Sequence, residues 1–202
     1  MNDIIITKGN LFSDRGAKLN RMALEDMTRT LMGTTDENIV EATLTQLWQQ
    51  KENRFSHEYT YEAKQEGNTL GLVTCYPVKL LNRLAWPTVK QLLQIRKWPL
   101  VLYAASHLQE IWNLLNLREG REDEFHIGTI ATAPESRGMG VGTKLLLHAE
   151  DVARQDGFSK MSLTVKQKNV LAHKLYQRMG YETVGKIDKN PFFLYRMVKH
   201  LS

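Results

Sequence analysis

Arg137-Gly138-Met139-Gly140-Val141-Gly142-Thr143 is the stretch that decides which fold this sequence predicts. It follows an alternating apolar run over residues 126–133, typical of a strand, and leads into a helical pattern over residues 145–153. A strand, a glycine turn and a helix start can bind an anion, because the first backbone N–H groups of a helix lack partners within it. Glycines also let a phosphate approach the main chain closely. The stretch alone is equally consistent with a tight turn that binds nothing.

Two common nucleotide-binding motifs do not fit. In a Walker A loop the lysine directly follows the last glycine, whereas Thr143 stands between Gly142 and Lys144 here. The Rossmann fingerprint is spaced G-x-G-x-x-G near the first strand of a βαβ unit, whereas these glycines are spaced G-x-G-x-G far into the chain. Neither of these nucleotide-binding folds is therefore expected.

The stretch does resemble the Arg/Gln-x-x-Gly-x-Gly/Ala signature of the GNAT superfamily of acyl-CoA-dependent N-acyltransferases, with Arg137, Gly140 and Gly142 at the marked places. A second block, one helix and one strand downstream, is similar to the family's Asn-x-x-Ala-x-x-Leu-Tyr-x-x-x-Gly-Phe/Tyr pattern. Its matching residues are Asn169, Ala172, Leu175, Tyr176, Gly180 and Tyr181. The resemblance covers Glu124 to about Val198, and the first 80 or so residues match only in the order of their elements.

This resemblance implies an α/β (α+β) fold with a mixed, mainly antiparallel central sheet that is flanked by helices and splays apart between strands 4 and 5. The hydrophobic pattern adds helices over residues 17–31, 37–50 and 170–179, and strands over residues 3–7, 55–66, 70–78, 161–165, 181–186 and 192–198. We expect one domain over residues 1–202.

Residues 81–117 depart from the compact family layout. They contain three of the four tryptophans, two prolines, and helical patterns around residues 89–97 and 104–117. We expect a helical insertion between strands 3 and 4, where the family places a segment over the acceptor site. It could cover a substrate, form a homodimer surface, or add a layer without a binding role.

Composition points to a soluble, cytoplasmic protein. No apolar run approaches the ~20 residues of a membrane span, and the first residues lack the features of a signal peptide. The single Cys75 cannot form an internal disulfide, is expected to be buried in a strand, and belongs to no cluster with metal-ligand spacing. Residues 79–121 carry seven basic and two acidic side chains, so the charge of this segment alone equals the net charge of +5 of the whole chain. Because no recognition motif accompanies this charge, nucleic acid is not an expected partner.

The resemblance implies acetyl-CoA as cosubstrate, without a metal. The pantetheine arm is expected to pair with the backbone of residues Ile130, Ala131 and Thr132, and with Asn169, which can also cap a helix. Arg137 either holds the phosphate end or is an idle surface residue. The diphosphate is expected on the amides of Gly138, Met139, Gly140, Val141, Gly142 and Thr143.

Three residues are candidates for the chemistry. Tyr176 matches the tyrosine that in many family members donates a proton to, or hydrogen-bonds, the CoA sulfur; otherwise it is a core aromatic residue. His126 stands where some members carry a base, and in a regular strand it shares a face with Gly128, Ile130 and Thr132, a phase that a bulge would break. It could equally be a packed histidine. Glu124 is the reserve base or a site for a cationic amine.

The leading hypothesis is an N-acetyltransferase that moves an acetyl group from acetyl-CoA to a primary amine of a small molecule or peptide, with a slight preference for the small molecule. The alternative is a non-catalytic acyl-CoA-binding or regulatory module on the same fold. The presence of Tyr176 in its motif favours the enzyme.

Overall fold

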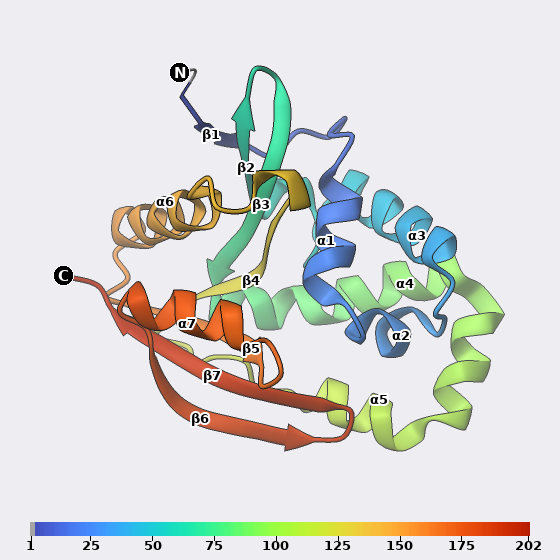
Figure 1. The fold of residues 1–202 in the computed structure, drawn as a ribbon. Helices are drawn as coiled ribbons and strands as arrows, with labels where there is room; N and C mark the ends of the chain where they lie inside the picture. The colour runs from blue at the N-terminus through green and yellow to red at the C-terminus, as the bar shows by residue number, and fades with distance from the viewer. Residues whose placement is uncertain (1–2) are drawn as a thin grey trace.

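The protein is built around one seven-stranded sheet, which a computed structural model describes over residues 3–202. The strand order is β1-β2-β3-β4-β5-β7-β6, and every neighbouring pair is antiparallel except β4 and β5 (Figure 1). The expected mixed, mainly antiparallel fold is therefore confirmed. The strands are β1 (Ile5–Lys8), β2 (Thr60–Gln65), β3 (Asn68–Pro77), β4 (Phe125–Thr132), β5 (Lys160–Lys166), β6 (Glu182–Lys189) and β7 (Phe192–His200).

Helices cover both faces of this sheet. The helix after the glycine stretch, α6, packs on β2, β3 and β4, whereas α1, α3 and α4 gather beyond the other face (Figure 1). The helices are α1 (Gly16–Leu24), α2 (Met27–Met32), α3 (Glu37–Gln49), α4 (Val78–Ser106), α5 (Leu108–Leu115), α6 (Val141–Gln155) and α7 (Val170–Arg178), with 3-10 turns at His57–Tyr59 and Pro134–Ser136.

Two buried cores hold these layers in place. One lies between the sheet and α6, with Leu145, Leu146 and Met161 at its centre and Cys75 among its members. The other lies among α1 to α4, where Leu44, Leu47 and Leu92 are buried. Burying large aliphatic side chains contributes about 1.5–3 kcal/mol each. Smaller clusters join these helices to the sheet, where Leu72 packs with Leu19 and Trp48, and Tyr76 packs with Leu81 and Leu84.

The sheet splays apart between β4 and β5, as expected. The two strands pair only where Phe125, His126 and Ile127 face residues 161–163. Beyond that point β4 stays paired with β3, and β5 stays paired with β7. The facing edges of β4 and β5 therefore open into a cleft.

The single helix predicted over residues 17–31 is wrong, because the chain breaks between α1 and α2. Glu25 there has φ 47°, a conformation that ends a helix. Its carboxylate pairs with Lys166 on β5 (2.8 Å), and Asp26 pairs with Lys168. No glycine or proline marks this break, which follows from contacts distant in sequence. Gly33 ends α2 in the left-handed conformation.

The insertion lies between β3 and β4, but its helices differ from the prediction. Helix α4 begins at Val78, directly after β3, because Leu81, Leu84 and Leu92 continue one buried stripe through Pro87. The chain kinks at Lys97 (φ 52°, ψ −139°), and α5 is shorter than expected. The pattern over residues 89–97 is therefore the last part of a helical segment that begins at Val78 and ends at the kink.

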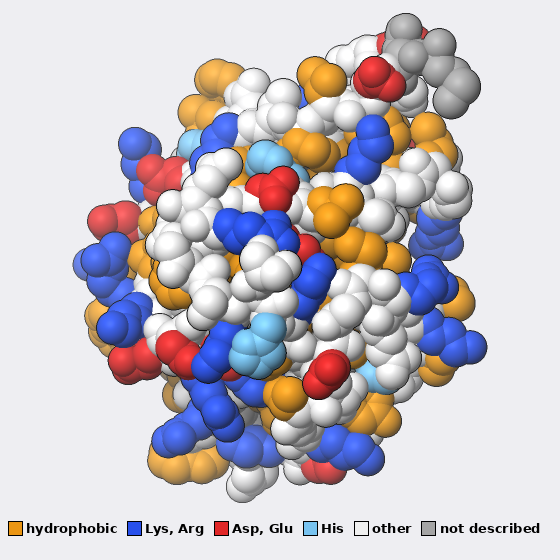
Figure 2. Space-filling model, turned by 90° about the vertical axis from the view of Figure 1, so that its left-hand side faces the viewer, with side chains coloured by type: hydrophobic (Ala, Val, Ile, Leu, Met, Phe, Trp, Pro, Cys, Tyr) orange, Lys and Arg blue, Asp and Glu red, His pale blue; other side chains and the backbone are white. Residues whose placement is uncertain are grey.

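None of the helices described in residues 3–202 is both long and apolar enough to cross a membrane. The end of the molecule that holds the C-terminal end of α6 and the end of the chain carries Lys and Arg interspersed with acidic side chains and scattered apolar ones (Figure 2). No broad apolar face is visible in this view.

Candidate active site

A cavity of about 240 Å³ lies where β4 and β5 separate. It is lined along one edge by residues 127–132 of β4 and along the other by residues 163–166 of β5. Helix α1 contributes Met22 and Ala23, and α7 contributes Tyr176. The predicted site residues Ile130, Ala131, Thr132, Arg137, Asn169 and Tyr176 all line this donor cleft.

Backbone direction in β4 leaves hydrogen-bonding groups facing the cleft. The Ala133 N–H donates to Leu70 O (2.8 Å) and the Ala131 carbonyl lies against Gly71, so these groups point toward β3. Because backbone groups alternate along a strand, those of Ile130 and Thr132 point toward the opened side. An extended chain in the cleft can therefore pair with β4 as an added strand would.

The glycine stretch forms an open cradle at the start of α6. Gly138 and Gly140 have φ of 82° and 76°, and a β-carbon on either would meet no atom within 4 Å. Gly140 is the N-cap of α6 and provides no side-chain cap, so the first amides of the helix face outward. The space and the free donors fit a diphosphate.

The neighbours of these glycines have different surroundings. Met139 is exposed, Val141 is buried in the core, and Thr143 is half-buried in the first turn of α6. Arg137 is exposed at the cleft. Among the described ion pairs none involves Arg137, so its guanidinium is available to an anion.

Asn169 and Tyr176 both come from the second motif. Asn169 caps α7 by accepting from Ala172 N (3.1 Å), which confirms the cap and leaves its NH₂ group for a ligand. Tyr176 is only 6% exposed, and burial raises the pKa of its hydroxyl above the ordinary value of 10. The hydroxyl is therefore protonated at neutral pH, the state that a proton donor needs.

A bulge at Gly128 changes the phase of β4. Thr129 faces Thr74 and Ile127 faces Cys75, so Gly128 has no partner in β3. Ile127 before the bulge and Ile130 after it both pack on the core under α6. The face that His126 shares with Gly128, Ile130 and Thr132 in a regular strand is therefore not formed.

His126 instead lies on the side of the sheet where Thr129 hydrogen-bonds Asn20 of α1 (3.0 Å). It is fully buried and does not line the donor cleft. It also does not line a second cavity, which shares Gly128 and Thr129 with this cleft. Its Nδ1 lies 3.0 Å from Ser162 Oγ, and its Nε2 lies 3.5 Å from Glu119 Oε2. His126 therefore has a carboxylate between itself and the cavities.

Glu119 is the site residue that sequence reasoning missed. Its carboxylate pairs with Arg54, and both side chains line a second cavity. Burial alone would raise the pKa of Glu119, but the charge of Arg54 and the contact with His126 outweigh it and hold this pKa at about 2. The carboxylate is therefore ionised at all ordinary pH values.

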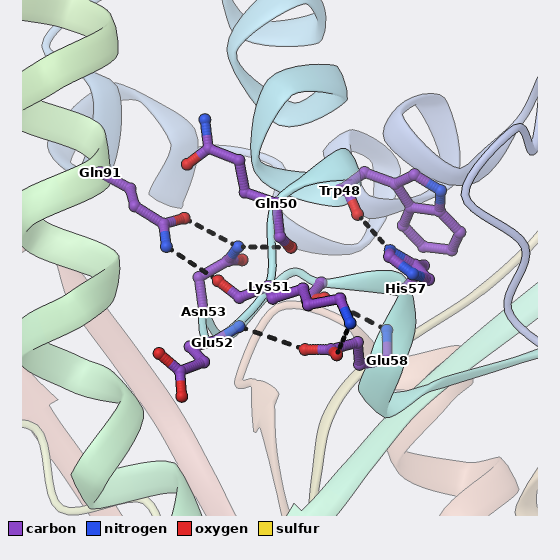
Figure 3. Close-up of polar contacts among 9 residues, drawn as sticks. Trp48, Gln50, Lys51, Glu52, Asn53, His57, Glu58 and Gln91 are labelled. Atoms are coloured by element: carbon purple, nitrogen blue, oxygen red, sulfur yellow. Dashed lines mark hydrogen bonds and ion pairs between the residues drawn. The ribbon is translucent and has the colours of Figure 1, made fainter.

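The loop between α3 and β2 is tied to α4 by side-chain hydrogen bonds (Figure 3). Asn53, fully buried, donates to Gln91 Oε1 in α4 (2.9 Å), and Gln91 donates to the Lys51 carbonyl (2.9 Å). The Arg54 N–H donates to Thr88 Oγ1 (3.0 Å). Three contacts thus tie the loop to the insertion, and the insertion fixes the cation that faces Glu119.

Glu124 has surroundings unlike those of Glu119. Its carboxylate pairs with Arg196 on β7 and accepts from Arg121 N (2.9 Å), and it lines neither the donor cleft nor the second cavity. Burial would raise its pKa, but these hydrogen bonds lower it below the ordinary value. The contacts make Glu124 a structural carboxylate that joins β4 to β7.

The second cavity has a volume of about 350 Å³ and shares Gly128 and Thr129 with the donor cleft. It lies between α1 and α2 on one side and the insertion helices α4 and α5 on the other. Tyr76, which hydrogen-bonds Arg54, stands at the shared point, and burial raises the pKa of its hydroxyl to about 12. We call this second cavity the acceptor cavity.

Comparison with known proteins agrees with this arrangement. Residues 24–181 match the family described as "Acetyltransferase (GNAT) family". The chain is 27% identical over 127 residues to the L-methionine sulfoximine/L-methionine sulfone acetyltransferase of Pseudomonas aeruginosa, covering 61% of this chain and 72% of that one. It is 41% identical over 59 residues to the streptothricin acetyltransferase of Streptomyces lavendulae, covering 29% and 31% respectively.

Solved structures show the same fold. An N-acetyltransferase from Staphylococcus aureus Mu50 aligns with a TM-score of 0.75 and 20% identity, covering 96% of this chain and 99% of that one. A further structure described as an acetyltransferase aligns with a TM-score of 0.64 and 21% identity, covering 98% and 100%. The fold is therefore shared over nearly the whole chain.

Proposed function

The chain belongs to the GNAT acetyltransferase family, and from this premise we propose that it transfers the acetyl group of acetyl-CoA directly to a primary amine. The observation that carries this proposal is the meeting of two cavities at Gly128 and Thr129, one with the features of a donor site and one separate from it. A direct transfer needs both substrates at one point.

We assign the position of acetyl-CoA from the backbone groups of the donor cleft that lack a partner within the sheet or helix. The amides of Gly138 and of residues 140–143 hold the diphosphate, with Arg137 beside them, whereas the Met139 N–H already donates to the Ser136 carbonyl (3.2 Å). The free backbone groups of Ile130 and Thr132 pair with the pantetheine arm. The Asn169 amide adds a donor. Acetyl-CoA supplies an acyl group that the thioester has already activated.

Proton transfer is assigned to residues at the two ends of the reaction. The amine nitrogen forms its bond to the acetyl carbon as the C–S bond breaks, so the amine loses a proton and the CoA thiolate gains one. Tyr176, protonated and facing the cleft, donates to the thiolate. The products are a neutral amide and CoA.

The amine side is assigned to Glu119 with His126 behind it. Glu119 faces the acceptor cavity and accepts a hydrogen bond from the amine, directly or through water. Because a carboxylate with a pKa of about 2 does not retain the proton, the proton that the amine loses passes through water to solvent. His126, hydrogen-bonded to Ser162, sits 3.5 Å behind that carboxylate and positions it. Glu124 keeps a structural role in this scheme.

The acceptor is proposed to be a small molecule. A volume of about 350 Å³ is at the low end of the ~300–1,000 Å³ typical of ligand pockets, and the insertion forms one wall of it. The names of the two curated relatives also point to small-molecule acceptors.

The experiment is an amine panel with acetyl-CoA, in which free CoA thiol and acetylated product are measured together. Amine-dependent release of equal amounts of both supports the transfer. If acetyl-CoA stabilises the protein but no amine releases CoA, the alternative of a non-catalytic acyl-CoA-binding module gains instead.

A further inference from the structure

The helices around the acceptor cavity line it mainly with apolar side chains, beside the uncharged polar Asn82 and Thr88 of α4. The α1–α2 segment contributes Leu31, the loop before β2 contributes Phe55, and α4 contributes Leu81 and Leu92. The last turn of α5 adds Leu114 and Leu115. A ligand that fills this space exchanges water for hydrocarbon, which favours an apolar body by about 25 cal/mol per Å² buried.

Charge in the cavity is confined to one pair. Of the residues that line it, Arg54 and Glu119 are charged at neutral pH, and each neutralises the other. Because Arg54 is already paired, a substrate carboxylate would find no free cation. Because the rest of the lining is apolar or uncharged, a second ammonium group would find no free anion. Burying either charge without a partner is strongly unfavourable.

The apolar surface continues from the wall to the outside. Leu115 lines the cavity and is 64% exposed, and Leu108 on the same helix is 70% exposed without lining it. Helix α5 therefore exposes apolar side chains both at the cavity wall, with Leu115, and outside the cavity, with Leu108.

We propose that the acceptor is a primary amine on an apolar body, such as an arylalkyl or branched alkyl amine, with no carboxylate and no second charge. This inference rests on the proposed function. The amine points to Gly128 and Glu119, where the two cavities meet, and the hydrocarbon lies against α2, α4 and α5. An amino acid and a polycation differ from this class by a charge that the cavity cannot pair.

The test compares 2-phenylethylamine with L-phenylalanine, which adds only a carboxylate beside the amine, and with spermidine, which adds further cations. We expect kcat/KM for 2-phenylethylamine to exceed that for either competitor by about a hundredfold. Equal or better turnover of L-phenylalanine or spermidine would overturn the substrate class while leaving acetyl transfer intact.

Binding is measured beside turnover, so that the two proposals fail separately. In the presence of CoA, 2-phenylethylamine should raise the unfolding midpoint and L-phenylalanine should not. That shift without any acetylated product would contradict the proposed function and keep the amine class. If 2-phenylethylamine gives neither acetylated product nor a shift of the midpoint, the apolar-amine assignment itself is contradicted.

Two matched variants on one helix locate the effect. Leu115→Glu places a charge on the cavity wall and should lower kcat/KM for 2-phenylethylamine by about tenfold or more, and should shift the preference toward spermidine. Leu108→Glu makes the same change at a similarly exposed position outside the cavity and should leave both unchanged. Equal effects of the two variants would overturn the placement.

Discussion

The hydroxyl of Tyr76 occupies the place where a β-carbon on residue 128 would stand. Gly128 is the unpaired residue of the β4 bulge, and both residues line the acceptor cavity. The absence of a side chain at the bulge thus lets the tyrosine reach the point where the two cavities meet. Tyr76, Gly128 and the bulge act as one structural unit.

Gly128→Ala should therefore be costly. The new methyl group must displace the buried Tyr76 ring, which we expect to lower the free energy of unfolding by about 1–3 kcal/mol and to reduce turnover. Denaturant unfolding and steady-state kinetics measure the two effects. Gly185→Ala is the matched control, because Gly185 also lies at a strand irregularity but a β-carbon there meets nothing within 4 Å. Equal stability of both variants would refute the packing argument.

Tyr176→Phe should lower turnover while leaving the KM for acetyl-CoA nearly unchanged. The substitution keeps the buried ring and removes only the hydroxyl, so about 10²–10⁴-fold is the expected loss for one proton donor. Tyr181→Phe is the control, because that ring lies 6.1 Å away and does not line the donor cleft. Full activity of Tyr176→Phe would remove this residue as the acid.

Glu119→Gln should change the pH dependence of stability. The pKa of Glu119 is about 2 in the folded protein against an ordinary 4.5, so its pairing stabilises the fold fully above pH 4.5 and is lost as the pH falls toward 2. The variant should lack that acid-dependent loss and should be less stable at pH 7 by about 3 kcal/mol, since Arg54 loses its partner. Denaturant unfolding between pH 7 and pH 3 checks both.

The exposed pair Arg15–Glu135 provides the control for that experiment. Glu135→Gln removes an ion pair at the surface, where solvent screens the charges, so we expect little change at any pH. A Glu119→Gln variant with the stability and pH dependence of the parent would show that the buried pair is not formed.

His126→Ala should lower the rate across the pH range, because Glu119 stays ionised but loses the side chain that positions its carboxylate. If His126 acts through Glu119, the double variant with Glu119→Gln should be no slower than Glu119→Gln alone. His148→Ala on α6 is the control, because His148 packs on Tyr61 away from both cavities. Additive losses in the double variant would contradict this coupling.

The donor half of the site was predictable because its residues follow one another along the chain. The stretch from Arg137 to Thr143 and the block that begins at Asn169 each lie at one turn between a strand and a helix. Local spacing is enough to place such groups, and the structure brings both motifs to the donor cleft. Their roles in binding remain predictions.

The acceptor half was not predictable from local patterns. Arg54, Tyr76 and Glu119 come from separate segments, and the packing of the insertion brings them together. Nothing in the sequence near Glu119 distinguishes it from the acidic residues that follow. The bulge at Gly128 likewise depends on pairing with β3, so the face assigned to His126 by alternation was out of phase.

The central claim is that the glycine cradle at the start of α6 binds the diphosphate of acetyl-CoA. Thermal unfolding with and without acetyl-CoA tests it directly, because a ligand that binds only the folded state must raise the midpoint. Gly140→Asp adds a carboxylate to the cradle. Gly157→Asp is the matched control, since Gly157 also has a positive φ (80°) and open space, but follows the other end of α6.

We predict that acetyl-CoA at a hundred times its Kd raises the midpoint of the parent by about 5–10 °C. Gly157→Asp should keep that shift and Gly140→Asp should lose it, even if both variants unfold at a lower temperature without ligand. An unchanged shift in Gly140→Asp, or no shift in the parent at millimolar acetyl-CoA, would contradict the assignment of this cleft as the donor site.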